Sequence, residues 1–183
     1  MTVRLLPAAG RAAVPWKNGG GVTREIAAWP EGAGMDDFAW RVSLADVRAD
    51  GPFSAFAGVD RILTMVEGAG MDLTVGGAHR RVDTRYVPQH FPGDLPTDCR
   101  LIAGPVVNLN VMWRRGGEAA PAVIVAHPGS PPAGPAALVV VLDGTAEVAG
   151  LTLGRYDAAL LTGESAVPRV TGRTAVVDLT GVR

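Results

Sequence analysis

Two short stretches, Met65-Val-Glu-Gly68 and Val141-Leu-Asp-Gly144, decide the fold, because each closes an apolar run with an acidic residue and a glycine. The runs that they close, residues 61–67 and 138–142, have the length of a buried strand. Later segments match in the same order: Phe91-Pro-Gly-Asp94 with Gly154-Arg-Tyr-Asp157, Ile102-Ala-Gly104 with Val170-Thr-Gly172, and Val107-Asn-Leu109 with Val177-Asp-Leu179. The chain therefore carries a degenerate internal repeat.

The rest of the chain has the composition of a β protein. Its 183 residues include 24 glycines and 14 prolines, and few windows place apolar residues at helical spacing. Residues 40–47 and 107–114 alternate apolar and polar side chains, as strands do. We therefore expect an all-β chain with two double-stranded β-helix (jelly-roll) barrels, an N-terminal one at residues 1–116 and a C-terminal one at 117–183.

Charge and length exclude several classes of partner. The net charge is −1 and the pI about 6.3, so no basic field exists to bind nucleic acid or an anionic membrane. No apolar stretch reaches the ~18 residues of a membrane span, and no apolar leader is present. A single cysteine, Cys99, cannot form an internal disulfide. These features predict a soluble, cytoplasmic protein.

The least ordinary segment is Val14-Pro-Trp-Lys-Asn-Gly-Gly-Gly-Val-Thr-Arg-Glu25, which holds the only lysine among 17 basic residues. Its three glycines allow an anion-binding nest, to which Lys17 and Arg24 would add charge. They equally suit a tight turn between two edge strands, with Trp16 packed as a lid. The residue types leave both interpretations open.

A second group of candidates lies on the polar faces of alternating strands. Arg41 and Ser43 share one face, and Asn108, Asn110 and Arg114 share another. In a barrel these faces either line the lumen or meet solvent, and the alternation does not decide between the two.

Metal and nucleophile chemistry find little support. The three histidines have no ligand spacing, and neither Cys99 nor Ser54 has a histidine beside it. Asp60 and Arg61 could form a charge pair at the barrel mouth or belong to a turn before a core strand. We expect no metal and no cofactor.

Several linked motifs resemble the HutD/Ves family. They are Pro15-Trp-Lys-Asn-Gly-Gly-Gly-Val-Thr-Arg-Glu-Ile26, Trp40-Arg-Val-Ser-Leu-Ala45, Gly51-Pro-Phe-Ser54 with Gly58-Val-Asp-Arg61, Phe91-Pro-Gly-Asp94 and Leu109-Asn-Val-Met112. The resemblance covers residues 3 to about 116, and the remainder resembles a generic second cupin half. It implies a bicupin with no established catalytic activity. Members of the HutD branch accompany histidine-utilisation genes and are thought to regulate or sense ligands, whereas the Ves branch is linked to stress responses.

Residues that match the family pattern imply a pocket in the N-terminal barrel, formed by Trp16, Lys17, Asn18, Arg24, Trp40, Arg41, Ser43, Arg61, Asn110 and Met112. The strand after Gly68 lacks the paired histidines and glutamate of metal-binding cupins, which favours metal-free ligand binding.

The leading hypothesis is a non-catalytic bicupin that senses a small anionic metabolite and regulates histidine utilisation. The ligand would be a carboxylate of histidine breakdown, such as formylglutamate or urocanate. One alternative is a cupin isomerase or lyase that uses Lys17, and another is a protein-interaction or stress-response module with a vestigial pocket. Because cupins commonly pair, a homodimer is also expected.

Overall fold

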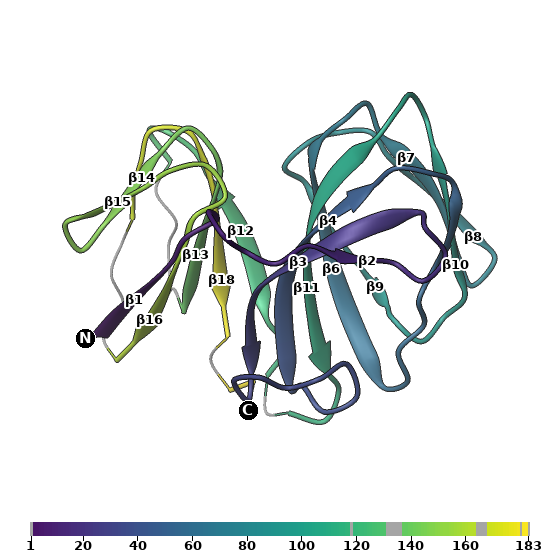
Figure 1. Cartoon of the computed structure of the whole chain (residues 1–183), viewed down its shortest axis with the longest axis horizontal. Coiled ribbons are helices and arrows are strands. Elements are labelled where there is room, and N and C mark those ends of the chain that lie inside the picture. The colour runs from purple at the N-terminus through teal and green to yellow at the C-terminus, as the bar shows by residue number, and fades with distance from the viewer. Residues whose placement is uncertain (1, 118, 131–136, 164–167, 180, 183) are drawn as a thin grey trace. The chain divides into compact units, whose positions relative to one another are not determined.

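The computed structural model describes residues 2–117, 119–130, 137–163, 168–179 and 181–182, and every regular element within these ranges is a β-strand (Figure 1). This confirms the expected all-β class. The described chain divides into two compact units. We call residues 12–117 the central unit, and the described parts of residues 1–11 and 118–182 the terminal unit. No helix that could cross a membrane occurs in the described ranges.

The boundaries differ from the expected 1–116 and 117–183 at the N-terminus. Strand β1 (Thr2–Leu6) pairs antiparallel with β16 (Ala158–Thr162), so the first residues of the chain belong to the terminal unit. The amide of Ala8 also donates to Asp157 Oδ1 at 2.7 Å. Local alternation does not reveal this pairing, because its partners lie some 150 residues apart in sequence.

The central unit consists of two antiparallel sheets. The six-stranded sheet has the order β2 (Val14–Pro15), β3 (Gly21–Trp29), β4 (Trp40–Val47), β11 (Val106–Arg114), β6 (Val59–Glu67) and β9 (Pro88–Pro92). The four-stranded sheet has the order β5 (Gly51–Phe53), β10 (Thr97–Leu101), β7 (Met71–Val75) and β8 (Ala78–Val82).

The terminal unit repeats this plan with fewer strands. Its five-stranded sheet has the order β1, β16, β13 (Leu138–Asp143), β18 (Arg173–Asp178) and β12 (Ala122–Ala126). Its three-stranded sheet has the order β15 (Leu151–Leu153), β14 (Ala146–Val148) and β17 (Arg169–Val170). The row β4-β11-β6-β9 thus corresponds, in chain order and in pairing, to β12-β18-β13-β16. The internal repeat is present in the topology.

One predicted match within the repeat is wrong. The counterpart of Tyr156 is Tyr86, because each adopts a positive φ (66° and 67°) and donates its amide to the equivalent strand, at Val141 O and Met65 O. The segment that matches Gly154-Arg-Tyr-Asp157 therefore lies around Arg85-Tyr86, before β9, and not at residues 91–94. The sequence does not reveal the correspondence of Tyr86 with Tyr156, because the number of residues between matching segments differs in the two halves.

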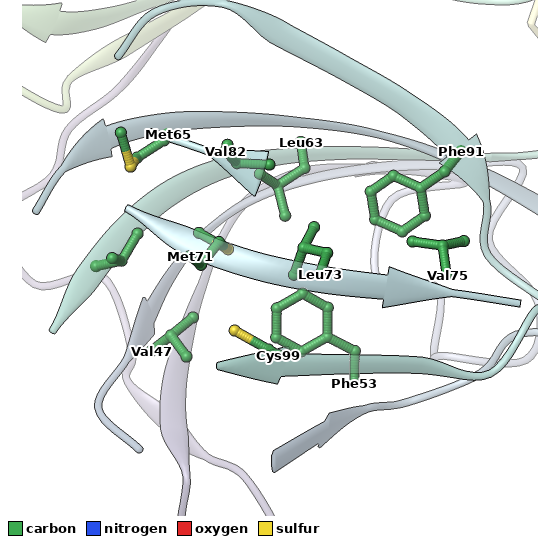
Figure 2. Packing of buried hydrophobic residues seen from close by; sticks show 11 residues of the cluster. Val47, Phe53, Leu63, Met65, Met71, Leu73, Val75, Val82, Phe91 and Cys99 are labelled. Atoms are coloured by element: carbon green, nitrogen blue, oxygen red, sulfur yellow. The ribbon is translucent and has the colours of Figure 1, made fainter. Parts of the chain in front are cut away.

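Each unit has its own apolar core. In the central unit the core joins side chains from both sheets (Figure 2): Val47, Phe53, Leu63, Met65, Met71, Leu73, Val75, Val82, Phe91, Cys99 and Val106. Cys99 is only 2% exposed, as its small apolar character predicted. Burial, with Asp50 and Asp72 nearby, raises the pKa of its thiol to about 12, so it is no nucleophile at neutral pH.

Candidate functional site

The central unit contains a cavity of about 580 Å³. Its buried or half-buried lining consists of Trp16, Thr23, Arg41, Ser43, Ala45, Phe53, Phe56, Arg61, Asn108, Asn110 and Met112. Its exposed lining, which we call the mouth, consists of Val14, Pro15, Lys17, Asn18, Met35, Asp36, Pro52 and Ser54.

The register of β11 against its two neighbours brings the polar side chains together. Asn110 lies opposite Ser43 on β4, and Met112 lies opposite Arg41 on β4 and Arg61 on β6. Residues in register point to the same face of a sheet, and here that face lines the cavity. Arg41, Ser43, Asn108 and Asn110 of the predicted polar faces therefore line the lumen, whereas Arg114, at the end of the second face, does not.

Arg61 is the buried charge of the cavity. It is 7% exposed, and its Nε lies 3.4 Å from Asn110 Oδ1, a long hydrogen bond. The guanidinium carbon lies 5.2 Å from the ring centroid of Phe53 and 5.3 Å from that of Phe91. Within the described residues no carboxylate forms an ion pair with it. The cavity therefore presents a desolvated cation whose counter-ion is not supplied by the described chain.

Burial lowers the pKa of the Arg61 guanidinium to about 10. At neutral pH the side chain still carries its charge, because this pKa lies well above 7. The possible Asp60–Arg61 pair is absent, since Asp60 Oδ1 lies 2.6 Å from Arg115 Nη1 instead. Successive residues of a strand point to opposite faces, which separates Asp60 from the cavity.

Asn108 is a second buried polar side chain of the cavity whose hydrogen bonding is incomplete. It is 1% exposed, lines the cavity and has no hydrogen bond to its Oδ1. A buried polar atom without a partner is destabilising, by about 1–3 kcal/mol in typical proteins. Two such groups on one wall are typical of a binding site whose ligand completes the hydrogen bonding.

Arg41, by contrast, already has a partner. Its Nε donates to Glu25 Oε2 at 2.7 Å, and its side chain is 11% exposed. Glu25 lies opposite Ser43 in the pairing of β3 with β4, so the ion pair spans two neighbouring strands at the cavity wall. Arg41 can contribute positive potential, but Arg61 is the residue whose charge is uncompensated.

The glycine segment forms the turn between β2 and β3. The amide of Gly19 donates to Trp16 O at 3.0 Å, and the amide of Gly20 donates to Asn18 Oδ1 at 3.0 Å. These two N–H groups are used inside the turn, which excludes the nest interpretation for them. Lys17 and Asn18 stand exposed at the mouth.

Trp16 is held firmly against the cavity. Its indole Nε1 donates to Thr23 Oγ1 at 2.7 Å, and its ring meets Phe53 edge-on at 5.9 Å. A Cβ on Gly21 would lie 2.6 Å from Asp46 O and 3.1 Å from the Trp16 ring. The third glycine of the segment is therefore required by close packing, and the packed-lid interpretation of Trp16 agrees with this geometry.

Two of the ten predicted residues lie elsewhere. Arg24 stands opposite Leu44, and Trp40 stands opposite Trp113, on the strand face that points away from the cavity. Eight of the ten line the cavity. The predicted site does not include the lining residues Val14, Pro15, Thr23, Met35, Asp36, Ala45, Pro52, Phe53, Ser54 and Phe56, and the sequence gives Asn108 only as part of a polar face. Side chains alternate between the two faces of β3, and this alternation places Thr23 in the cavity and Arg24 outside it. Loop residues carry no such signal.

Metal chemistry gains no support from the geometry. Within the described ranges no three His, Cys, Asp or Glu side chains gather closely enough to hold a metal ion. His79 and His90, expected in a loop, lie on β8 and β9 beside Asp72 (3.4 Å) and Asp60 (3.9 Å).

The internal repeat provides a control for the site. By register, Ser43, Asn108 and Asn110 correspond in the terminal unit to Ile124, Thr174 and Val176. The described lumen of that unit is filled by apolar side chains such as Val139, Val141 and Leu161. The two units therefore differ at the positions of Ser43 and Asn110, which are apolar in the terminal unit, whereas the position of Asn108 is polar and buried in both.

Two jelly-roll units in one chain, one of which encloses a polar cavity, define a cupin-like two-barrel protein. A cupin barrel domain protein from Leptotrichia buccalis has the same fold, with a TM-score of 0.60 at 11% identity over 94% of this chain and 98% of that one. The HutD family model matches residues 8–177, so the chain belongs to the HutD family.

Relatives at higher identity agree with this assignment. The structure of HutD from Pseudomonas fluorescens SBW25 is 33% identical, with a TM-score of 0.85 over 97% of both chains. An uncharacterised 21.2 kDa protein in the hutC 3′ region of Pseudomonas putida is 40% identical over 61% of this chain and 58% of its own length. Protein Ves of Cronobacter sakazakii is 38% identical over 55% of this chain and 54% of its own. The chain thus spans little more than half of these curated relatives.

Proposed function

We propose that this protein binds a small carboxylate in the central cavity and, as a sensor of that ligand, regulates histidine utilisation. The observation that carries the proposal is Arg61, a buried cation in an open cavity without a carboxylate partner among the described residues. A ligand carboxylate would supply the missing charge and accept from the guanidinium fork.

The energetics suit a metabolite sensor. Hydrogen bonds to charged groups contribute about 1.5–3 kcal/mol each, so two or three of them are compatible with micromolar affinity. Asn110 and Ser43 would orient the ligand, and Trp16 and Phe56 would cover its apolar part. Asn108 Oδ1 is an acceptor, so it would take a ligand N–H, such as that of the formamide of formylglutamate or the imidazole of urocanate. Lys17 would add attraction at the mouth.

The choice of ligand class rests on the relatives. One is described by its position in the hutC 3′ region, and another is named HutD. We therefore propose an acid of histidine breakdown, with formylglutamate and urocanate as the first candidates. A non-catalytic role in the cytoplasm, as a homodimer, completes the proposal.

The two alternatives have less support. An isomerase or lyase would need Lys17 in a dry pocket, but Lys17 is exposed at the mouth. A vestigial pocket would be filled by its own side chains, whereas the central unit retains about 580 Å³ of space.

Thermal-shift and calorimetric titrations with formylglutamate, urocanate, glutamate and histidine test the proposal. We expect an acid of the pathway to raise the melting temperature and bind with micromolar affinity, and we expect imidazole, which carries no carboxylate, to have no effect. Folded protein that responds to none of the acids would refute the ligand class.

A further inference from the structure

Two loops build part of the cavity mouth and its apolar wall. Residues 30–39, between β3 and β4, contribute Met35 and Asp36 to the lining. Residues 54–58, between β5 and β6, contribute Ser54 and Phe56. Neither loop belongs to a sheet. Backbone hydrogen bonds hold parts of both, from Arg114 N to Ala39 O (2.9 Å) and from Phe56 N to Gly93 O (2.8 Å), and side-chain contacts add to these.

Arg114, the last residue of β11, provides such contacts without lining the cavity. Its Nε donates to Phe38 O at 3.0 Å, its Nη2 donates to Asp36 O, and its Nη1 lies 3.5 Å from Ala57 O. Its guanidinium carbon stacks over the Phe38 ring at 5.3 Å. One side chain therefore contacts both loops, and it contacts the first at two carbonyl groups.

The loop of residues 30–39 is also held by an apolar cluster. Phe38 is completely buried and clusters with Val59 and Met112, with Phe56 and Ala33 packed beside them. Met112 belongs to the buried lining of the cavity, so this small cluster connects that lining to both loops. The guanidinium fork and the cluster together hold Met35 and Asp36 at the mouth.

We propose that Arg114 is a positioning residue that sets access to the cavity and thereby the rates at which a ligand enters and leaves. The effect of Arg114 on ligand rates rests on the proposed function, whereas its effect on the accessibility of Arg61 does not. A lysine cannot replace it, because one ammonium group on a flexible stem does not reproduce the planar fork that engages the two carbonyls and the ring.

Access can be measured without any carboxylate ligand. Phenylglyoxal modifies arginine side chains, and peptide mass spectrometry gives its rate of reaction at Arg61 alone. Three proteins are compared: the wild type, R114K and R115K. Arg115 is a matched control, since it lies one residue further along and its side chain pairs with Asp60 and Asp94, away from residues 30–39.

We expect R114K to label at Arg61 about tenfold faster than the wild type, because local opening follows the loss of the anchoring hydrogen bonds. R115K should label at the wild-type rate. Hydrogen exchange of residues 31–39 should rise in R114K only. Equal labelling rates in all three folded proteins would overturn the proposal, and R114Q, which keeps a planar donor, replaces R114K if that variant does not fold.

Stopped-flow binding of a pathway acid separates this proposal from the proposed function. We expect R114K to raise both the association and the dissociation rate, with a smaller change in Kd. Unchanged rates would contradict the proposal. If no acid binds the wild type but R114K still exposes Arg61, the proposed function fails while the positioning role of Arg114 stands.

Discussion

At the scale of the residue, the binding role proposed for Arg61 comes with a structural disadvantage. A buried charge without a partner is destabilising, and apolar residues of similar size often replace buried ions with no loss of stability. We therefore expect Arg61→Met to unfold at an equal or higher denaturant concentration than the wild type, yet to lose carboxylate binding. Urea titration measures the stability of the variant, and calorimetry measures its carboxylate binding. If Arg61→Met is several kcal/mol less stable than the wild type, the contacts of Arg61 stabilise the fold and the prediction is wrong.

Arg61 also determines how binding depends on pH. Its pKa of about 10 means that the guanidinium is charged at neutral pH and becomes neutral as the pH rises through that value. Carboxylate affinity should therefore stay constant from about pH 6 to 9 and fall above about 10, while the ligand remains ionised throughout. Calorimetry across this range checks the prediction. A decline that is already complete by pH 9 would indicate a different titrating group.

Cys99 provides a residue-scale test of the core. Its folded pKa of about 12 lies above the ordinary value of 9.0, so the thiol contributes stability below pH 9 that is lost as the pH rises toward 12. The wild type should therefore lose stability relative to Cys99→Ala between these limits. Denaturation midpoints of both proteins at pH 8 and pH 10.5 measure this, and a constant difference would count against the buried thiol.

At the scale of the element, the β2–β3 turn shows what close packing requires. Ala at position 21 would place a Cβ 2.6 Å from Asp46 O and against Trp16. Such overpacking typically destabilises by about 1–3 kcal/mol, and it should also displace Trp16 and weaken ligand binding. Gly20→Ala is the matched control, because its Cβ would meet only the Asn18 side chain, at 3.3 Å. Equal melting temperatures for the two variants would contradict this account.

Individual strands differ in how far the sequence predicts them. Residues 40–47 form a strand with the predicted bounds, because alternation marks them. Strand β8 was missed, since four of its five residues are exposed and carry no periodic signal. In the same way, the alternation predicts polar faces on β4 and β11 but does not show that they line a cavity. It also does not show that Arg61 lacks a carboxylate partner among the described residues.

At the scale of the whole molecule, the repeat divides roles between two similar units. The strand order β4-β11-β6-β9 of the central unit recurs as β12-β18-β13-β16 in the terminal unit. Ile124 and Val176 of the terminal unit occupy the positions of Ser43 and Asn110. The chain should therefore bind one ligand per copy. The sequence predicted two barrels, and only the structure shows that β1 returns to the second of them, because that pairing spans nearly the whole chain.

A calorimetric titration of formylglutamate and urocanate into the wild type and Arg61→Met at pH 7.5 tests the proposed carboxylate site most directly. We expect one of these acids to bind the wild type with a stoichiometry of one per chain and micromolar affinity, and we expect the folded variant to give no heat of binding. Undiminished binding by Arg61→Met would contradict this proposal, and so would two equal sites per chain.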